Sequence, residues 1–292
     1  MRICRFNTNR LGLIEGDRVY DVTAALDGLD AERWPPVAGD RLIGNLGRLG
    51  GEMNRLRRAA EPVALADVEL FCPVSTPTKI MAAPANYRRH VEEDTKDPEV
   101  DQGVHRAQML TVDKPVYTYG LFLKACSSLV GPAEGIHLSW PEPGRRVDHE
   151  VEVAVVIGRQ GRHIDPKNAL EHVAGLALGL DLTVRGSEER SFRKSGETFA
   201  VLGPWLTTLD EVADPDDLTF WLSVNGQERQ RSSTRHMTVG IRDLIAFASR
   251  HYTLHPGDIL LTGTPEGVGP LAAGDVMTVG GEGLGDMRIQ VR

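Results

Sequence analysis

Three carboxylates occur at alternate positions in a segment that otherwise has the composition of a buried strand. The segment VDHEVEVAVVIG (residues 147–158) carries Asp148, Glu150 and Glu152. Because side chains alternate between the two faces of a strand, these acids share one face and valines occupy the other. Close carboxylates repel one another and burial makes each charge more costly, so cations, basic side chains or water must compensate them. A solvated edge strand is the alternative, but the apolar run AVVIG favours a strand that continues into the interior.

A divalent cation at this position would need oxygen ligands from more than one strand. Mg²⁺ usually binds a few carboxylates together with water and substrate oxygens, and Glu150 and Glu152 could supply two. Asp181 is the best candidate for a third because it interrupts the apolar run GLALGLDLTV. An aspartate that caps a turn at the end of a strand is an equal alternative. No histidine near these acids has zinc-site spacing, so the pattern favours a hard cation with oxygen ligands.

The elements that must position these acids are mostly short strands. From residue 115 onward, short apolar runs broken by Gly, Pro, Asn and Asp predict a β-rich, barrel-like or sandwich-like body. Two helices are expected within it, over residues 166–178 after a capping aspartate and over residues 239–250. The acidic run at residues 92–108 has no periodicity and is interpreted as a surface loop.

The first 70 residues are expected to form a small α/β unit. Strands are predicted over residues 1–6 and 11–14, and a helix over residues 41–60 that is interrupted by two glycines at positions 50 and 51. A Pro-, Ser- and Thr-rich stretch at residues 71–80 is interpreted as a linker. We therefore expect a predominantly β, α+β chain with two domains, 1–70 and 71–292.

Composition excludes several classes of protein. The chain has 292 residues and a net charge of −8, which argues against a broad nucleic-acid interface. No segment reaches the ~18 apolar residues of a membrane span, and the N-terminus lacks the apolar core of a signal peptide. The three cysteines are widely spaced and predict neither a disulfide framework nor a metal pair. We therefore expect a cytoplasmic protein whose partners include neither nucleic acid nor a membrane.

Seven segments occur in the order typical of the fumarylacetoacetate hydrolase family, and the chain resembles its bacterial members with an N-terminal extension. The resemblance runs from about residue 79 to the C-terminus. The segments are NYRRH (86–90), LFLKACSSLVGP (121–132), VDHEVEVAVVIG (147–158), LDLTVRG (180–186), RKSGETFAVLGPW (193–205), VNGQERQ (224–230) and LHPGDILLTGTPEGVG (254–269). The family includes acylpyruvate hydrolases, oxaloacetate decarboxylases and isomerase/decarboxylases of an aromatic-degradation pathway.

The resemblance implies a catalytic domain with a mixed β-roll fold, a homodimer and a site for Mg²⁺ or Mn²⁺, with Ca²⁺ as a third candidate. The family's metal ligands fall on the same three acids, Glu150, Glu152 and Asp181. Its substrate lysine falls on Lys194. A histidine and a glutamate that activate water in the family fall on His90 and Glu93. A surface histidine is the simpler interpretation of His90 without the family context.

Further substrate contacts are expected at Arg185, Thr264 and Tyr87. A guanidinium suits a carboxylate, although a structural salt bridge is the alternative for Arg185. The turn TGTPEGVG would present Thr264 and backbone amides to a substrate carboxylate, unless it is a plain β-turn. Several positions differ from the family pattern. Gly186 replaces a frequent aspartate, Glu188 occupies the place of a substrate-binding glutamine, Ala125 replaces a proline, and KSGETF, with Glu197, replaces a KSFDTF-like string.

The resemblance implies a metal-dependent hydrolase that cleaves a C–C bond in a 2,4-dioxo acid, either an acylpyruvate or a fumarylacetoacetate-like compound, in aromatic catabolism. A 2-oxo acid isomerase or decarboxylase of the same family is the second hypothesis. A catalytically silent homologue that binds a small dicarboxylate is the third. Asp148 has no ligand role in the family, and we expect it to be exposed or paired with Arg145 or Arg146.

Overall fold

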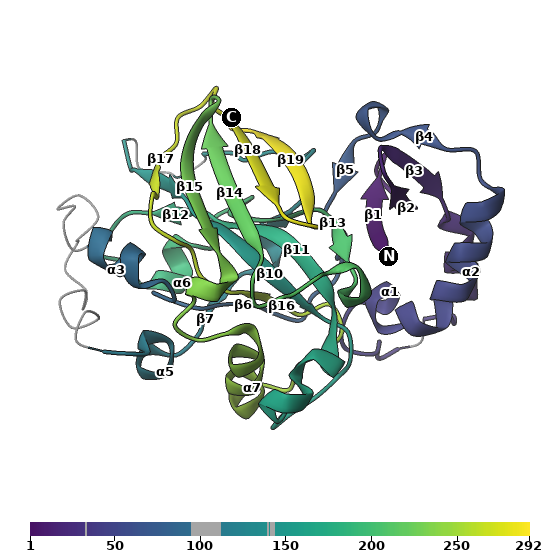
Figure 1. Cartoon of the computed structure of the whole chain (residues 1–292), viewed down its shortest axis with the longest axis horizontal. Coiled ribbons are helices and arrows are strands. Elements are labelled where there is room, and N and C mark those ends of the chain that lie inside the picture. The colour runs from purple at the N-terminus through teal and green to yellow at the C-terminus, as the bar shows by residue number, and fades with distance from the viewer. Residues whose placement is uncertain (33, 95–111, 139, 141–143) are drawn as a thin grey trace.

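The computed structural model describes residues 1–32, 34–94, 112–138, 140 and 144–292 (Figure 1). Within this part of the chain, twelve strands form one large sheet. In spatial order they are β4 (Val63–Ala64), β3 (Arg18–Asp21), β2 (Arg10–Glu15), β1 (Arg2–Phe6), β13 (Ala200–Thr207), β11 (Val173–Asp181), β10 (Val151–Ile157), β16 (Ile259–Leu261), β6 (Ile80–Ala82) and β7 (Phe122–Lys124), with β5 (Leu70–Phe71) on β1 and β8 (Leu129–Val130) on β13.

Two smaller sheets accompany the large one. The three-stranded sheet has the order β12 (Thr183–Val184), β9 (Val147–His149) and β17 (Gly269–Pro270). The four-stranded sheet has the order β15 (Gln227–Ser233), β14 (Thr219–Val224), β18 (Val276–Gly281) and β19 (Gly285–Gln290). The expectation of a predominantly β, α+β chain is confirmed.

Helices lie around the sheets. The α-helices of the described residues are α1 (Arg41–Gly44), α2 (Leu46–Ala59), α3 (Arg88–Asp94), α5 (Pro115–Tyr119), α6 (Arg190–Arg193) and α7 (Ile241–His251). Short 3₁₀ turns are η1 (Thr23–Gly28), η2 (Leu65–Asp67), η3 (Cys126–Ser128), η4 (Pro166–His172), η5 (Leu209–Glu211) and η6 (Thr234–His236). None of the described helices has the length and apolar character needed to span a bilayer.

Some local predictions are confirmed and others are wrong. The strands predicted near the N-terminus match β1 and β2, and the helix predicted over residues 239–250 matches α7. The helix predicted over residues 166–178 is wrong, because η4 ends at His172 and β11 begins at the next residue. β11 is hydrogen-bonded on both sides, by β10 and β13, which explains its continuous apolar run. The helix predicted over residues 41–60 breaks at Asn45, not at its glycines.

Two segments predicted to be irregular contain residues of a helix or a strand. The first residues of the acidic run, predicted as a loop, belong to α3, and residues 95–108 of that run fall outside the described residues. The stretch interpreted as a linker begins within β5, which pairs with β1.

Strand β10 is buried on both faces. Val151, Val153 and Val155 join a cluster of buried apolar residues that includes the four-stranded sheet and α7. Ala154 and Val156, which point the other way, join a second cluster that includes residues of β1, β2 and α2. Alternation therefore puts the carboxylates of this strand on the side of the second cluster. Because both faces of β10 are covered, a carboxylate on either face is kept away from solvent.

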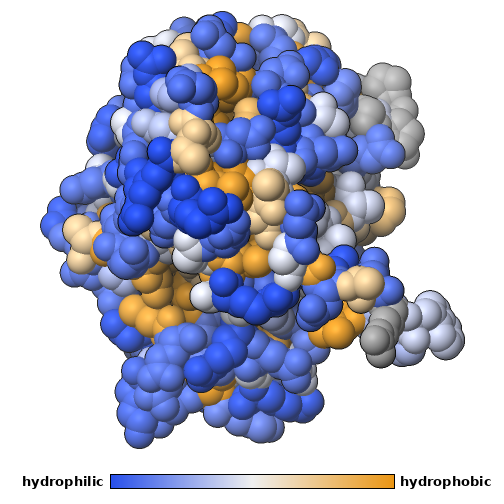
Figure 2. Space-filling view, turned by 90° about the vertical axis from the view of Figure 1, so that its right-hand side faces the viewer, coloured by the Kyte–Doolittle hydropathy of each residue, from blue (hydrophilic) through white to orange (hydrophobic). Residues whose placement is uncertain are grey.

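The first 70 residues extend the large sheet. Strand β1 pairs antiparallel with β13, with Ile3 opposite Leu206, and β1 is also paired with β2. Figure 2 looks onto this side of the molecule and shows a mostly hydrophilic surface with scattered apolar patches. The division into domains 1–70 and 71–292 stays a prediction, because strand pairing does not test whether either part folds alone.

We predict that Asp40 fastens this N-terminal unit to the rest of the protein. Its buried carboxylate accepts hydrogen bonds from the amides of Ile43, Ser75 and Thr76 at 2.7–3.1 Å. Asp40→Ala would leave the buried Ile43 amide without its acceptor and remove the bonds to Ser75 and Thr76, so the free energy of unfolding in urea should fall by about 1–3 kcal/mol. Asp17→Ala is the matched control, because that side chain is 88% exposed. An equal loss in both variants would contradict the prediction.

Candidate metal centre

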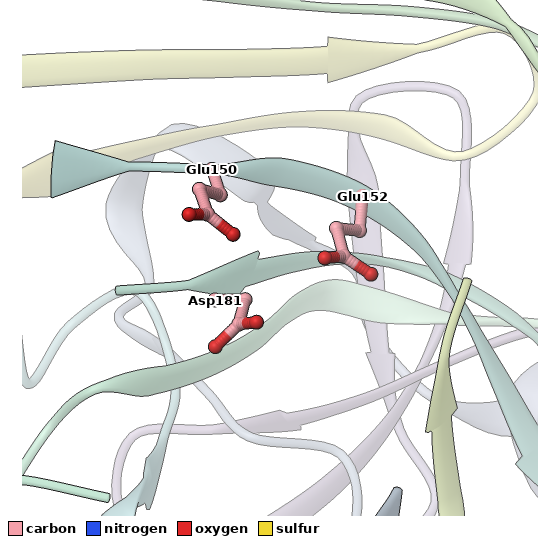
Figure 3. Close-up of side chains that lie close together, drawn as sticks. All are labelled: Glu150, Glu152 and Asp181. Atoms are coloured by element: carbon pink, nitrogen blue, oxygen red, sulfur yellow. The ribbon is translucent and has the colours of Figure 1, made fainter. Parts of the chain in front are cut away.

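Glu150, Glu152 and Asp181 meet where two paired strands leave the large sheet. Glu150 lies between β9 and β10, at the point where the chain passes from the three-stranded sheet into the large one. Asp181 ends β11, and its amide donates to the carbonyl of Glu150 at 2.9 Å. One carboxylate oxygen from each of the three acids lies within 4.8 Å of the others, and all three residues are buried (Figure 3). The predicted ligand set is therefore brought together.

Two lysines hold part of this cluster. The Lys194 ammonium donates to Glu150 Oε2 at 2.8 Å, to Asp181 Oδ2 at 2.7 Å and to Thr183 Oγ1 at 2.6 Å. Lys124, at the end of β7, donates to Asp181 Oδ1 and to the carbonyl of Lys194. Lys194 was expected to contact a substrate, whereas here it is also a direct partner of two acids.

Lys124 is a residue that sequence reasoning missed. Its side chain is fully buried, and burial lowers the pKa of its ammonium, an effect that the charge of Asp181 opposes. The sequence did contain an indication of its burial. Phe122 and Lys124 are two residues apart in a short strand, so the lysine lies on the same face as a core residue. A buried lysine needs an acidic partner, and Asp181, an acid within an apolar run, is a candidate for that partner.

Glu150 is well compensated by cations. Burial alone would raise the pKa of Glu150, but the charges of Lys194, Arg185 and His90 together outweigh it, so the pKa lies below its ordinary value. Arg185 Nη2 lies 3.4 Å from Glu150 Oε1. The carboxylate of Glu150 is therefore held in its ionised form, the form that binds cations.

Glu152 is not compensated in this way. Its carboxylate accepts a hydrogen bond from the Gly263 amide at 2.6 Å, and the described residues provide it with no ion-pair partner. Burial, followed by repulsion from Asp181 and Glu150, raises the pKa of Glu152 well above its ordinary value. A buried acid beside two other buried acids is the arrangement that a divalent cation relieves. The three carboxylates therefore fit a hard cation with oxygen ligands.

Asp148 serves a different purpose from its two neighbours. Its carboxylate accepts from Arg146 Nε at 2.7 Å and from Arg185 Nε at 2.8 Å, and the residue is fully buried. The expected pairing with Arg146 is confirmed, and the alternative of an exposed Asp148 is wrong. Arg185 therefore forms the structural salt bridge that was the alternative to a substrate contact.

Two of the departures from the family pattern, Gly186 and Glu188, lie at one ion pair. Arg145 binds both carboxylate oxygens of Glu188 at 2.8 and 2.9 Å, and it lowers the pKa of Glu188 to about 2. A Cβ on Gly186 would lie 2.0 Å from the Arg145 guanidinium, so a larger residue here would displace the ion pair from its present position. Glu188, at the place of the family's substrate-binding glutamine, is therefore paired with Arg145.

Helix α3 carries the predicted water-activating residues. His90 is 7% exposed and close enough to Glu150 to help lower its pKa. Glu93, three residues later on the same helix, accepts from the Gly267 amide at 2.7 Å. Tyr87, just before α3, is buried, and burial followed by the charge of Glu152 raises the pKa of its hydroxyl. That hydroxyl has no hydrogen-bond partner among the described residues.

The turn after β16 also faces the carboxylate strand. Thr262 Oγ1 donates to the Val153 carbonyl at 2.8 Å, and Thr264 Oγ1 donates to the Val151 carbonyl at 2.9 Å. Gly263, between them, has φ +99°, a conformation that favours glycine. The turn thus fixes the amide that binds Glu152, and it leaves Thr264 beside the cluster.

The chain belongs to the fumarylacetoacetate hydrolase family, because residues 79–292 match the family described as "Fumarylacetoacetate (FAA) hydrolase C-terminal". It is 47% identical to the maleylpyruvate hydrolase of Aquipseudomonas alcaligenes over 100% of this chain and 99% of that protein. It is 33% identical to the 2,4-didehydro-3-deoxy-L-rhamnonate hydrolase of Sphingomonas sp. (strain SKA58), over 100% of this chain and 96% of that one.

A solved structure gives the same relationship. The maleylpyruvate hydrolase from Sphingobium sp. SYK-6, in complex with manganese(II) ion and pyruvate, is 39% identical and has a TM-score of 0.81 over 100% of this chain and 98% of that one. The predicted family and enzyme class, a metal-dependent hydrolase of a C–C bond in a 2,4-dioxo acid, are confirmed. The roles of the individual site residues stay predictions.

We predict that Lys124→Met destabilises the metal-free protein, because Asp181 then loses one of its two cationic partners. Removing one partner of a buried ion pair should lower the free energy of unfolding of the metal-free protein by about 3 kcal/mol. Added Mn²⁺ should then raise the melting temperature more in the variant than in wild type, because the ion supplies the missing charge. Lys167→Met, at a side chain that is 74% exposed, should behave as wild type. An equal or smaller Mn²⁺ effect in Lys124→Met would contradict this.

Proposed function

We propose that this enzyme hydrolyses maleylpyruvate, or a closely similar 2,4-dioxo dicarboxylic acid, to pyruvate and a second carboxylic acid in the breakdown of aromatic compounds. The observation that carries the proposal is the buried cluster of Glu150, Glu152 and Asp181, in which Glu152 lacks a cationic partner among the described residues. The full-length similarity to a maleylpyruvate hydrolase supports the choice of substrate.

Glu150, Glu152 and Asp181 would hold the cofactor, which we propose is Mn²⁺ or Mg²⁺, with Ca²⁺ as a third candidate. A bound divalent cation polarises an oxo group of the substrate and offsets negative charge that develops there. Lys194 would add a positive charge beside the substrate carboxylate. Its ammonium is held by two acids and Thr183, so this charge is oriented before the reaction begins.

His90 is the proposed general base. Its imidazole would take a proton from water, and the resulting hydroxide would attack the carbonyl farther from the 2-oxo acid end. The C–C bond between that carbonyl and the pyruvate methylene then breaks. The electron pair stays on the pyruvate fragment, which takes up a proton to complete pyruvate.

Glu93 is proposed to orient His90, since a spacing of three places both on one face of α3. Its bond to the Gly267 amide also ties α3 to the turn that carries Thr264. Tyr87 and Thr264 are proposed to contact the substrate, and the unpartnered hydroxyl of Tyr87 supports its assignment. Arg185 is proposed to act on the substrate mainly through the acids that it binds.

A tautomerase or isomerase/decarboxylase is the second candidate function. The human mitochondrial oxaloacetate tautomerase FAHD2A is 38% identical over 70% of this chain and 61% of that protein. The cation and Lys194 would serve both reactions, whereas attack by water would serve hydrolysis alone. A catalytically silent homologue is less well supported, because the acids and both lysines of the cluster are present. We also propose that the enzyme is a cytoplasmic homodimer.

We predict that Mn²⁺-loaded enzyme releases pyruvate from maleylpyruvate and that EDTA abolishes this release. His90→Ala should lower kcat by about 10²- to 10⁴-fold, because the water then lacks its general base. Pyruvate release can be followed with lactate dehydrogenase and NADH. His251→Ala, at an exposed histidine of α7, should keep wild-type activity.

A second assay, run beside the first, separates the two candidate functions. Oxaloacetate is supplied to the wild-type enzyme, and the interconversion of its keto and enol forms is followed by ultraviolet absorbance. Faster tautomerisation of oxaloacetate than hydrolysis of maleylpyruvate would favour the second candidate. Undiminished hydrolysis by His90→Ala would exclude His90 as the base.

A further inference from the structure

We propose that Gln230 is a positioning residue that sets the spacing between the metal-binding carboxylates and the Thr264 turn. The proposal rests on the proposed metal site. Gln230 lies on β15, at the edge of the four-stranded sheet, and is fully buried although the three residues before it are exposed. It belongs to the VNGQERQ segment, which leads from the end of β14 into β15. Its side chain reaches out of its own sheet to two other segments.

The orientation of the Gln230 amide follows from its backbone partners. Its oxygen lies 3.1 Å from the Val151 amide, which can only donate, and its nitrogen lies 2.9 Å from the Pro265 carbonyl, which can only accept. The oxygen therefore accepts and the nitrogen donates. The remaining contacts, His149 Nδ1 at 3.0 Å and Thr264 Oγ1 at 2.8 Å, use the second lone pair and the second hydrogen.

The orientation of the Gln230 amide also determines which hydrogen bonds His149 and Thr264 donate. His149 Nδ1 lies 3.0 Å from the Gln230 oxygen, which accepts, so this nitrogen carries the hydrogen that it donates to Gln230. Thr264 accepts from Gln230 and passes its own hydrogen to the Val151 carbonyl. All four hydrogen-bonding positions of the Gln230 amide are thus used, which leaves the side chain a single arrangement.

The two residues bound by the Gln230 oxygen flank a proposed metal ligand. His149 ends β9 and Val151 begins β10, and Glu150 lies between them, where the chain changes sheets. Strand β11 pairs with Val151 on one side, and the Gln230 side chain binds its amide. Gln230 therefore restrains the peptide unit that follows Glu150 and the side chain of the residue that precedes it.

The Gln230 nitrogen holds the turn that positions the second ligand. Thr264 and Pro265 follow directly after Gly263, whose amide donates to Glu152. Gly267 of the same turn packs closely against β15, since a Cβ there would lie 2.0 Å from the Arg229 carbonyl and 3.3 Å from Gln230 Cγ. One amide group thus connects the backbone around Glu150 to the turn that binds Glu152.

The test uses Gln230→Met, which keeps the length of the side chain and removes its hydrogen bonds. Groups that orient metal ligands typically contribute about 10- to 100-fold to metal affinity, so the Kd for Mn²⁺ measured by isothermal titration calorimetry should rise by that factor. The Mn²⁺ concentration for half-maximal pyruvate release should rise in parallel. At saturating Mn²⁺, kcat should return to within about threefold of wild type, because a filled site restores the ligand positions.

Two further variants make the result specific. Gln290→Met is the control, because Gln290 lies on β19 of the same sheet and its exposed side chain donates to backbone carbonyls away from the cluster. Thr264→Val removes one of the four contacts and should weaken Mn²⁺ binding less than Gln230→Met does. Circular dichroism of the metal-free variants establishes whether they are folded.

Several results would overturn the proposal. They are a Kd for Mn²⁺ within twofold of wild type in Gln230→Met, an equal loss in Gln290→Met, a kcat that stays low at saturating Mn²⁺, or loss of the folded state in both Gln230→Met and Thr264→Val. Failure of wild type to bind Mn²⁺ would instead refute the proposed metal site, and with it this inference. If wild type binds Mn²⁺ and Gln230→Met binds it with the same Kd, only the role of Gln230 is refuted and the proposed metal site stands.

Discussion

The cost of keeping several carboxylates together inside a β-sheet protein governs the rest of this structure. Four acids gather where β10 begins and β11 ends, and four basic side chains form ion pairs with members of this group. The acids are Asp148, Glu150, Glu152 and Asp181. The basic residues are Lys124, Arg146, Arg185 and Lys194. Formal charges cancel, yet Glu152 has no direct cationic partner among the described residues. A divalent cation beside it would bring the cluster to a formal charge of about +2, which suits a substrate with two carboxylates.

The architecture positions this cluster through strand pairing. The pairing of β10 with β11 places Asp181 against Glu150, and the turn after β16 supplies the amide that binds Glu152. Both faces of β10 are covered by apolar clusters, so the polar groups are confined to the strand ends. Helix α3 is held over the same end by the bond between Glu93 and Gly267. Ligands, turn and helix therefore form one connected unit.

The metal-ligand candidates could be predicted from sequence because each carried its own local signal. A period of two marked Glu150 and Glu152, and an acid in an apolar run marked Asp181. Lys124 and Gln230 could not be assigned in this way, because their partners lie 34 to 81 residues away in the chain and strand order is not visible in periodicity. The same limit explains the error at η4 and β11: an apolar run of this length suits a helix or a doubly paired strand, and only its neighbours decide.

The most direct test of this account is an anomalous-difference map from crystals soaked in Mn²⁺. The account predicts a single strong peak between the carboxylates of Glu150, Glu152 and Asp181, and its loss in crystals of Glu152→Gln. The absence of a peak there in well-ordered wild-type crystals, or a strong peak at other residues, would contradict the claim that this buried cluster is a metal site.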